Sequence, residues 1–395
     1  MSTLHYAWRM ILGIFIFCLV LCINGHTQAK KPIKKPSVKP AAKLWEAAQR
    51  YESRDDFGKD GPKDNWKLAM KTDIDKSFPH DEKVTVIRYS ANGDGLFVGT
   101  NAGNLVCWDI AGQKLKWKTA VFTGKTAGDN VFVQFLAVSP AGDNVAVWYG
   151  ESRAGITQLA YSIVIINATT GSKVKEIVGK DGNDYYVLQD AHYAADGFIY
   201  GILDLNSRAY ATQINVKEGK YSWRYLVINP TTDNCWLPKP KLYVPDGGKA
   251  KKIVAFTCQN KAKTIDFKTA KRKIAGNVKV FGEYAMKSFN EIGRNRAIAL
   301  HAESGSSVSY IVEYTNLKSR KFPHSKLADL QIDPTQGTAS FDGKYYAVVD
   351  GYVLWVWDTA TGKIVYKSNG GGSMIIAHPT KKEFIAYGAE LYIHR

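Results

Sequence analysis

Sequence patterns that mark several common classes of enzyme and metal site are missing from this chain of 395 residues. It has no G-x-S-x-G sequence, in which a nucleophilic serine stands on a sharp turn, and no H-E-x-x-H pair of zinc ligands. Its five cysteines include no C-x-x-C spacing, so no cysteine-based zinc site is predicted. We therefore expect neither a bound metal nor a cofactor, and the sequence identifies no catalytic residue.

Long hydrophobic runs are scarce as well. The longest, Met10–Ile23, has fourteen residues, whereas a membrane-spanning helix needs about twenty. Arg9 precedes this run and small residues lead up to a cleavage site after Ala29, so residues 1–29 are interpreted as a secretory signal peptide. The alternative is an uncleaved membrane anchor formed by residues 10–23, because the lysines that follow oppose translocation. We expect a secreted or periplasmic protein, or a membrane-anchored one in the alternative.

Acidic residues are fewer than basic ones: 36 Asp and Glu stand against 53 Lys and Arg, which gives a net charge of +17. One part of the excess lies near the N-terminus, where residues 30–63 are interpreted as a Lys/Pro-rich linker that contains a short helix near residues 41–52. Another part lies in residues 239–279, which hold twelve basic and two acidic residues. The charge therefore indicates a tail and one local patch rather than a general positive coat.

Three cysteines remain once the signal peptide is removed: Cys107, Cys235 and Cys258. In an oxidising compartment Cys235 and Cys258 could form a disulfide, because they lie in neighbouring strands of one predicted sheet. The alternative is three buried free thiols, since cysteine often packs in strands as a small apolar residue. The sequence leaves both possibilities open.

From about residue 84 onward the sequence repeats one pattern: an apolar strand, a turn led by Asp or Asn, and a further strand. The side chain of Asp or Asn accepts hydrogen bonds from nearby backbone N–H groups, which is why these residues begin turns. Successive turn-leading residues are 44 to 58 positions apart, a spacing typical of units built from four strands. The turn-leading residues are Asp109, Asn167, Asn215, Asp266, Tyr314 and Asp358.

Two of these turns carry a more specific signature. Trp108-Asp109 and Trp357-Asp358 end the third strands of their units. Turns of small polar residues, such as Ser139–Asp143, join the first strand of a unit to the second. Over residues 84–395 this pattern resembles WD40 repeats, although the Gly-His dipeptide of that family is absent from every unit, and it is also similar to PQQ-type propeller repeats. Either resemblance implies a β-propeller, in which four-stranded sheets, the blades, surround a central channel.

The last repeat unit predicts how the ring closes. It begins at Met374 and offers three strands before Arg395. A segment near residues 66–71 resembles the fourth strands of other units, so we expect it to complete the last blade and to leave no open sheet edge. The predicted fold is therefore all-β, a seven-bladed β-propeller over residues 64–395 whose last blade is closed by an N-terminal strand.

The basic segment 239–279 is the best functional clue. Clustered lysines attract polyanions such as acidic polysaccharide, anionic lipid or an acidic protein. The alternative is a solvated sheet edge whose charges prevent pairing with other sheets. Nucleic acid is disfavoured, because an exported protein rarely meets it and the segment lacks interleaved aromatic residues. The candidate residues for an anionic partner are Lys249, Lys251, Lys252, Lys261, Lys263, Lys271, Arg272 and Lys273.

Two weaker candidates lie in a predicted first strand. Asp190 and His192 are two residues apart, so they share one face of the strand, and first strands line the channel of a propeller. An acid–base or metal-binding role is one interpretation, and a structural histidine held by its neighbour is the favoured one. Gly370–Gly372 precedes an inner strand rather than a helix, so it is interpreted as a connection between blades and not as a phosphate-binding loop.

Two functions are compatible with this reading. The favoured one is an exported, monomeric WD40-like propeller that acts as a protein-interaction scaffold, with an unidentified protein or acidic polymer as partner. A membrane partner enters only if the N-terminal segment stays uncleaved. The alternative is a propeller enzyme, such as a quinoprotein-like oxidoreductase or a metal-dependent hydrolase, with its site at the channel mouth. The largely apolar first strands favour the scaffold, but fold-level resemblance alone does not decide function.

Overall fold

A computed structural model describes the chain from residue 65 onward, with gaps. The described ranges are residues 65–121, 130–153, 156–158, 162–178, 180–181, 184–185, 187–205, 208–228, 241–244, 252–256, 261–268, 271–277, 286–291, 296–303, 306–313, 318–321, 336–349, 353–362 and 364–395. The predicted signal peptide, linker and short helix lie outside these ranges, as do Cys235 and Cys258. Among the described residues, no helix has the length and hydropathy of a membrane span.

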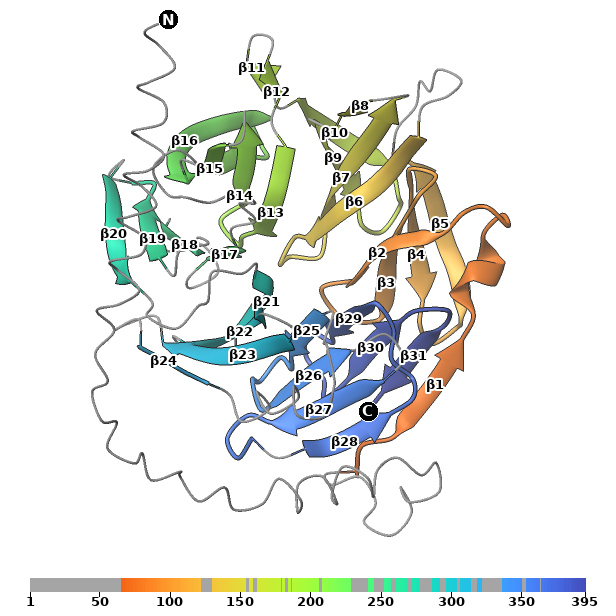
Figure 1. The fold of residues 1–395 in the computed structure, drawn as a ribbon. Helices are drawn as coiled ribbons and strands as arrows, with labels where there is room; N and C mark the ends of the chain where they lie inside the picture. The colour runs from red at the N-terminus through yellow and green to blue at the C-terminus, as the bar shows by residue number, and fades with distance from the viewer. Residues whose placement is uncertain are drawn as a thin grey trace, which may run out of the picture. The chain divides into compact units, whose positions relative to one another are not determined.

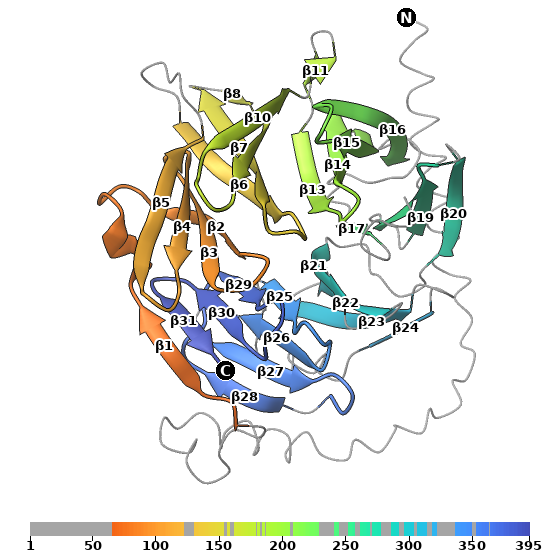
Figure 2. The ribbon, with the colours of Figure 1, turned by 180° about the vertical axis from the view of Figure 1, so that it is seen from behind.

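Antiparallel β-sheets make up the described residues, six of them with four strands, one with five and one with two. The two-stranded sheet is formed by β11 (Lys180–Asp181) and β12 (Asp184–Tyr185). A short 3-10 helix, η3 (Ile74–Ser77), precedes β2. Figures 1 and 2 show the larger sheets arranged one after another around a common centre.

The first three large sheets follow the chain in order. One contains β2 (Val84–Tyr89), β3 (Gly95–Thr100), β4 (Asn104–Asp109) and β5 (Lys114–Ala120). The next contains β6 (Asn130–Val138), β7 (Asn144–Arg153), β9 (Ser162–Asn167) and β10 (Lys173–Val178), with β8 (Ile156–Gln158) paired to β7. The third contains β13 (Val187–Tyr193), β14 (Phe198–Leu205), β15 (Arg208–Asn215) and β16 (Lys220–Ile228).

Three further sheets continue this order. The fourth contains β17 (Lys241–Tyr243), β18 (Lys252–Phe256), β19 (Lys261–Asp266) and β20 (Lys271–Asn277). The fifth contains β21 (Met286–Glu291), β22 (Arg296–Glu303), β23 (Ser306–Glu313) and β24 (Lys318–Lys321). The sixth contains β25 (Gln336–Ala339), β26 (Tyr345–Val349), β27 (Leu354–Asp358) and β28 (Ile364–Ser368). The last sheet combines the two ends of the described chain: β29 (Met374–Ala377), β30 (Phe384–Tyr387), β31 (Leu391–His394) and β1 (Leu68–Thr72).

The predicted turns between third and fourth strands are present, and the Asx hydrogen bonds explain them. Asn167 Oδ1 accepts bonds from the N–H groups of Thr169 and Thr170 at 3.0 and 2.9 Å. Asp358 Oδ1 accepts bonds from the N–H groups of Ala360 and Thr361 at 3.1 and 2.7 Å. The same residue type therefore serves the same turn in different sheets. The turn explains the presence of Asp358 without a catalytic role for its carboxylate. Tyr314 lies outside the described residues.

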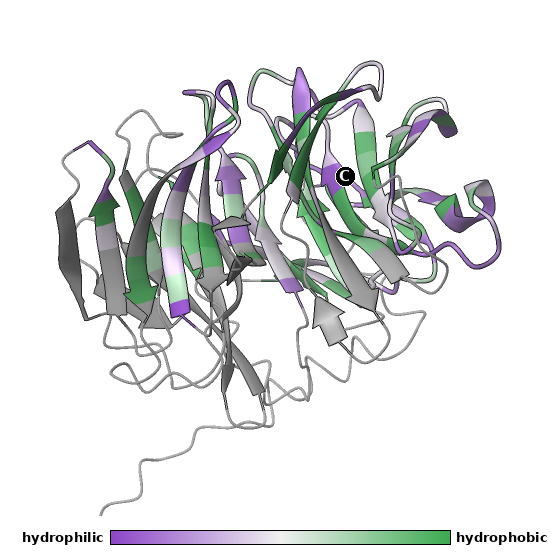
Figure 3. Cartoon of the chain, turned by 90° about the horizontal axis from the view of Figure 1, so that it is seen from above, coloured by the Kyte–Doolittle hydropathy of each residue, from purple (hydrophilic) through white to green (hydrophobic). Residues whose placement is uncertain are grey.

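Apolar residues on both faces of each sheet form the core. Along β4, Val106 and Trp108 pack against the sheet that contains β30 and β31, whereas Leu105 and Cys107 pack against the sheet of β6 and β7. Successive strand residues point to opposite faces, so a strand between two neighbouring sheets is apolar at consecutive positions. Figure 3 shows the hydrophobic colour concentrated on the strands and the hydrophilic colour on many connecting turns.

An N-terminal strand pairs with the last sheet, as the sequence predicts. β1 pairs antiparallel with β31, and Lys67 and Arg395 exchange backbone hydrogen bonds of 2.7 and 3.0 Å. The strand spans Leu68–Thr72, close to the predicted segment near residues 66–71, and Trp66, which precedes it, is fully buried.

The glycine run Gly370–Gly372 joins β28 to β29, so the prediction of a connection between sheets is confirmed. The reason for glycine is close backbone packing. A Cβ at Gly372 would lie 2.1 Å from the Tyr387 carbonyl oxygen, a distance that no side chain tolerates.

Candidate functional site

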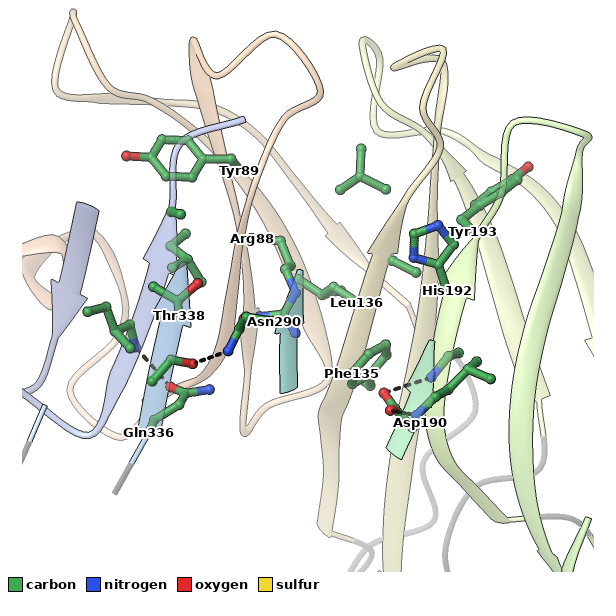
Figure 4. Close-up of a pocket in the computed structure, with 18 residues that line it drawn as sticks. Arg88, Tyr89, Phe135, Leu136, Asp190, His192, Tyr193, Asn290, Gln336 and Thr338 are labelled. Atoms are coloured by element: carbon green, nitrogen blue, oxygen red, sulfur yellow. Dashed lines mark hydrogen bonds between the residues drawn. The ribbon is translucent and has the colours of Figure 1, made fainter. Parts of the chain in front are cut away.

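A cavity of about 460 Å³ lies where the first strands of the large sheets meet. Its wall comes from all seven of these strands, β2, β6, β13, β17, β21, β25 and β29. Figure 4 shows polar side chains from several of these strands around the cavity, with apolar side chains between them. The labelled polar and aromatic side chains are Arg88, Tyr89, Phe135, Asp190, His192, Tyr193, Asn290, Gln336 and Thr338. We call this cavity the channel.

Asp190 is held by backbone groups on two strands. Its Oδ1 accepts a bond from Ala191 N–H at 3.1 Å, and its Oδ2 accepts one from Leu242 N–H at 2.9 Å on β17. Thr85 makes a comparable link, because its hydroxyl donates to the Val133 carbonyl of β6 at 2.5 Å. Both side chains therefore connect one first strand to the first strand of the next sheet.

Asn290 and Gln336 continue this arrangement around the channel. Asn290 Nδ2 donates to the Gly337 carbonyl at 2.9 Å, which joins β21 to β25. Gln336 Oε1 accepts from Ile375 N–H at 2.8 Å, which joins β25 to β29. First strands of neighbouring sheets form no ladder with each other, so these side chains supply the polar links that backbone pairing supplies within a sheet. We call these residues, with Asp190 and Thr85, the strand links.

His192 lies on the channel wall beside Asp190, as the two-residue spacing predicts, but Asp190 does not bond to it. The described residues show no hydrogen bond between the two side chains, so the interpretation of a histidine held by this neighbour stays a prediction. The imidazole faces the channel, where surrounding protein removes part of its solvation. This burial lowers the pKa of His192, and Asp190 and Asp196 oppose the shift.

Arg88 is the cationic side chain of the described channel wall. Its Nη1 donates to the Ile87 carbonyl at 3.1 Å, and its Cζ lies 5.4 Å from the centre of the Phe135 ring. Burial lowers the pKa of Arg88, and the charge of Asp190 opposes this shift. The guanidinium still stays protonated at neutral pH, because an arginine pKa is far above 7.

The sequence pattern identified Asp190 and His192 as residues of a first strand but did not single out Asn290, Gln336 or Thr338. These three lie on β21 and β25, which are short and carry too little alternation to be identified as inner strands. For Gln336 and Thr338 a usable signal was the Ser340–Gly343 turn after their strand, because it resembles the Ser139–Asp143 turn after β6.

Solved structures provide the comparison with known proteins. No protein-family model matches the chain, and no curated protein matches it. The β-propeller domain of Cps50 (Swd1) from Myceliophteria thermophila is similar with a TM-score of 0.61 and 15% identity, over 83% of this chain and 99% of that one. Hydrazine synthase of Kuenenia stuttgartiensis is similar with a TM-score of 0.59 and 14% identity, over 78% of this chain and 94% of that one.

The fold is a β-propeller. At identities of 15% and 14% these likenesses concern the fold alone. One of the two similar proteins is named as an enzyme and the other as a propeller domain, so the likeness does not separate binding from catalysis.

The predicted basic residues of the propeller fall largely on one sheet, β17–β20, which we call the basic sheet. Its β20 is the outermost strand. Lys249 and Lys251 lie outside the described residues. Lys252 lies on β18, Lys261 and Lys263 lie on β19, and Lys271, Arg272 and Lys273 lie on β20.

The described residues contain no cluster of three or more His, Cys, Asp or Glu that could hold a metal ion. Cys107 is a free, buried cysteine on β4, and burial raises the pKa of its thiol to about 11. Such a thiol is unreactive at neutral pH, since the thiolate is the nucleophile.

Proposed function

We propose that this protein is an exported β-propeller that acts as a binding scaffold rather than an enzyme, and that its basic sheet binds an anionic protein or acidic polymer. The observation that carries the scaffold role is the use of the strand links. Asp190, Asn290 and Gln336 each bond to the backbone of a neighbouring first strand. Polar residues that could serve chemistry are thus part of the framework. Export rests on the signal-peptide pattern of residues 1–29.

We further infer that the large sheets are the blades of a closed, seven-bladed ring. Each first strand contacts the next in the order β2, β6, β13, β17, β21, β25 and β29, and β29 contacts β2. The pairing of β1 with β31 supports closure by the N-terminal strand. Tyr89 also donates a hydrogen bond of 2.6 Å to Glu383, which links the first large sheet to the last.

The alternative of a propeller enzyme requires acids and histidines that converge on one end of the channel. Asp190 is the carboxylate of the described channel wall, and it accepts two amide hydrogen bonds. Both oxygens are therefore engaged in bonds to the backbone of β13 and β17, a framework role that favours the scaffold. Hydrolase or oxidoreductase activity that depends on Asp190 would support the alternative.

The charge balance of the basic sheet supports an anionic partner. Its strands β18, β19 and β20 contain six Lys or Arg and one acid, Asp266. Asp266 leads the turn to β20 and accepts a hydrogen bond from Lys268 N–H at 2.9 Å. The acid therefore serves the turn, and the strands carry a positive excess that steers anions to this sheet.

The test measures binding of the purified protein to an immobilised polyanion over a salt series. The variant changes Lys249, Lys251, Lys252, Lys261 and Lys263 to Glu. The control applies the same charge change to five exposed lysines elsewhere in the chain, Lys114, Lys116, Lys217, Lys220 and Lys381. We expect binding that weakens with salt, is lost in the basic-sheet variant and is retained in the control.

Equal loss in both variants would mean that net charge alone drives binding, and the basic sheet would lose its special role. Equal retention would reduce its lysines to the protection of a sheet edge.

A further inference from the structure

Arg88 has a position in the channel that the proposed scaffold role leaves unexplained. A guanidinium has five N–H donors, and the bond to the Ile87 carbonyl uses one of them. Among the described residues, no carboxylate forms an ion pair with Arg88. Asp190 is the acid of the same wall, but its two oxygens face the amides of Ala191 and Leu242.

The contacts of Arg88 among the described residues leave most of its donors available to a ligand. Its Cζ lies over the Phe135 ring, 5.4 Å from the ring centre, and this contact with the ring face takes up no hydrogen-bond acceptor. Two parallel N–H groups match the two oxygens of a carboxylate or phosphate. Figure 4 shows the Arg88 side chain among the groups that line the channel.

The rest of the channel suits a small organic molecule that carries such a group. The volume of about 460 Å³ is within the range of small-molecule sites. Leu136 and Ile376 contribute apolar wall, and Thr338 contributes a hydroxyl. His192 has no hydrogen-bond partner among the described residues and faces the same space.

Electrostatics favours an anion at this place. A cation taken out of bulk water without a partner loses solvation, and an opposite charge restores part of the loss. Burial lowers the pKa of Arg88, in keeping with this loss. We propose that the channel holds a binding site for a small organic oxyanion, a carboxylate or a phosphate, which pairs with the Arg88 guanidinium.

The test titrates the whole protein with succinate, citrate and inorganic phosphate by calorimetry, with neutral succinamide as the matched probe. The variants are Arg88→Gln, Arg88→Lys and Asp190→Asn. Arg208→Gln removes one exposed positive charge outside the channel and serves as the control. Circular dichroism and thermal unfolding establish that each variant folds. A preference among the three anions distinguishes a carboxylate ligand from a phosphate ligand.

We expect at least one anion to bind, with affinity reduced about tenfold or more in Arg88→Gln and unchanged in Arg208→Gln. Arg88→Lys should bind with intermediate affinity, because an ammonium keeps the charge but not the two parallel donors. Asp190→Asn should bind several-fold more tightly, since it removes a negative charge from the same wall and keeps an oxygen for Leu242 N–H. This variant keeps the test informative if Arg88→Gln does not fold.

Three outcomes overturn the proposal: no anion binds at up to about 10 mM, the weak end of specific association; Arg88→Gln binds as well as Arg208→Gln; or succinamide binds as well as succinate. Arg88 lies on β2, in a different sheet from the lysines of the basic sheet. Arg88→Gln should therefore leave binding to the immobilised polyanion unchanged, and failure of one proposal does not imply failure of the other.

Discussion

His394 is a fully buried histidine whose two ring nitrogens both have partners. Its Nε2 donates to the Gly370 carbonyl at 2.9 Å, so its Nδ1 accepts from the Tyr366 hydroxyl at 3.1 Å. Burial lowers the pKa of His394 from 6.5 to about 4, although the bond to Gly370 opposes the shift. The neutral imidazole suits this place, because a proton on Nδ1 would remove the acceptor that Tyr366 uses.

His394 should make the fold sensitive to acid. The unfolded histidine takes up a proton near pH 6.5 and the folded one near pH 4, so its stabilising contribution is complete above pH 6.5 and is lost as the pH falls from 6.5 to 4. The loss in the free energy of unfolding is up to about 3 kcal/mol. Urea unfolding at several pH values measures it. His394→Asn should be less stable at neutral pH but should lose less between pH 6.5 and 4.

The control for this prediction is His80→Gln, which removes an exposed histidine and leaves the buried one in place. If wild type and His394→Asn lose stability in parallel between pH 6.5 and 4, then the histidine does not determine the acid response.

At the scale of the element, one of the turns between third and fourth strands in the described part of the chain differs from the others. The fourth residue after the turn-leading Asn or Asp is Gly219 with φ of 72° and Gly362 with φ of 66°. After Asp109 the same position is Gln113, with φ of 47°. A residue with a Cβ is strained in this left-handed region, where glycine is not.

Gln113→Gly should therefore stabilise the protein, by about 0.5–1 kcal/mol, because relief of strain exceeds the entropy that glycine adds to the unfolded chain. Chemical denaturation measures the change. The converse variant, Gly219→Ala, should destabilise by about 1 kcal/mol, because alanine is strained in this left-handed region. Its Cβ would meet the Lys175 side chain at 3.4 Å, an ordinary contact, so the cost is that of the backbone. A decrease in stability for Gln113→Gly would show that the Gln113 side chain contributes more than the backbone costs.

At the scale of the whole molecule, Trp66 connects segments that are more than 270 residues apart. Its ring is stacked on Phe384 at 5.3 Å and meets Tyr345 edge-on at 5.2 Å, and Lys382 Nζ lies 4.7 Å from it. Phe384 belongs to the last sheet and Tyr345 to the sheet before it. The residue that leads into β1 therefore packs between two sheets and positions the strand that follows.

Trp66→Ala should lower the free energy of unfolding by about 3–5 kcal/mol, the range for a large buried aromatic side chain. Hydrogen exchange should also become faster in β31, because β1 loses its anchor. Trp66→Phe is the matched variant and should lose much less, since Trp66 Nε1 has no hydrogen-bond partner to forfeit. Similar losses in both variants would assign the effect to the indole shape rather than to the aromatic contact.

The repeat and the turns were determined by the sequence alone, because turn chemistry is local. Asn167, Asn215, Asp266 and Asp358 each bond to backbone N–H groups two or three residues away, so the type of residue carries the information. The apolar strands between these turns predicted the repeated four-stranded units. The propeller and the pairing of its N-terminal strand with the last sheet follow from these patterns.

Only the tertiary structure decided what the polar residues of the first strands do. Asp190, Asn290 and Gln336 bond to backbone atoms 39 to 52 residues away, on neighbouring sheets. The packing of one sheet against the next sets such distances, and no local pattern encodes them. The place of Arg88 over the Phe135 ring, without an ion pair among the described residues, likewise depends on how separate sheets meet at the channel.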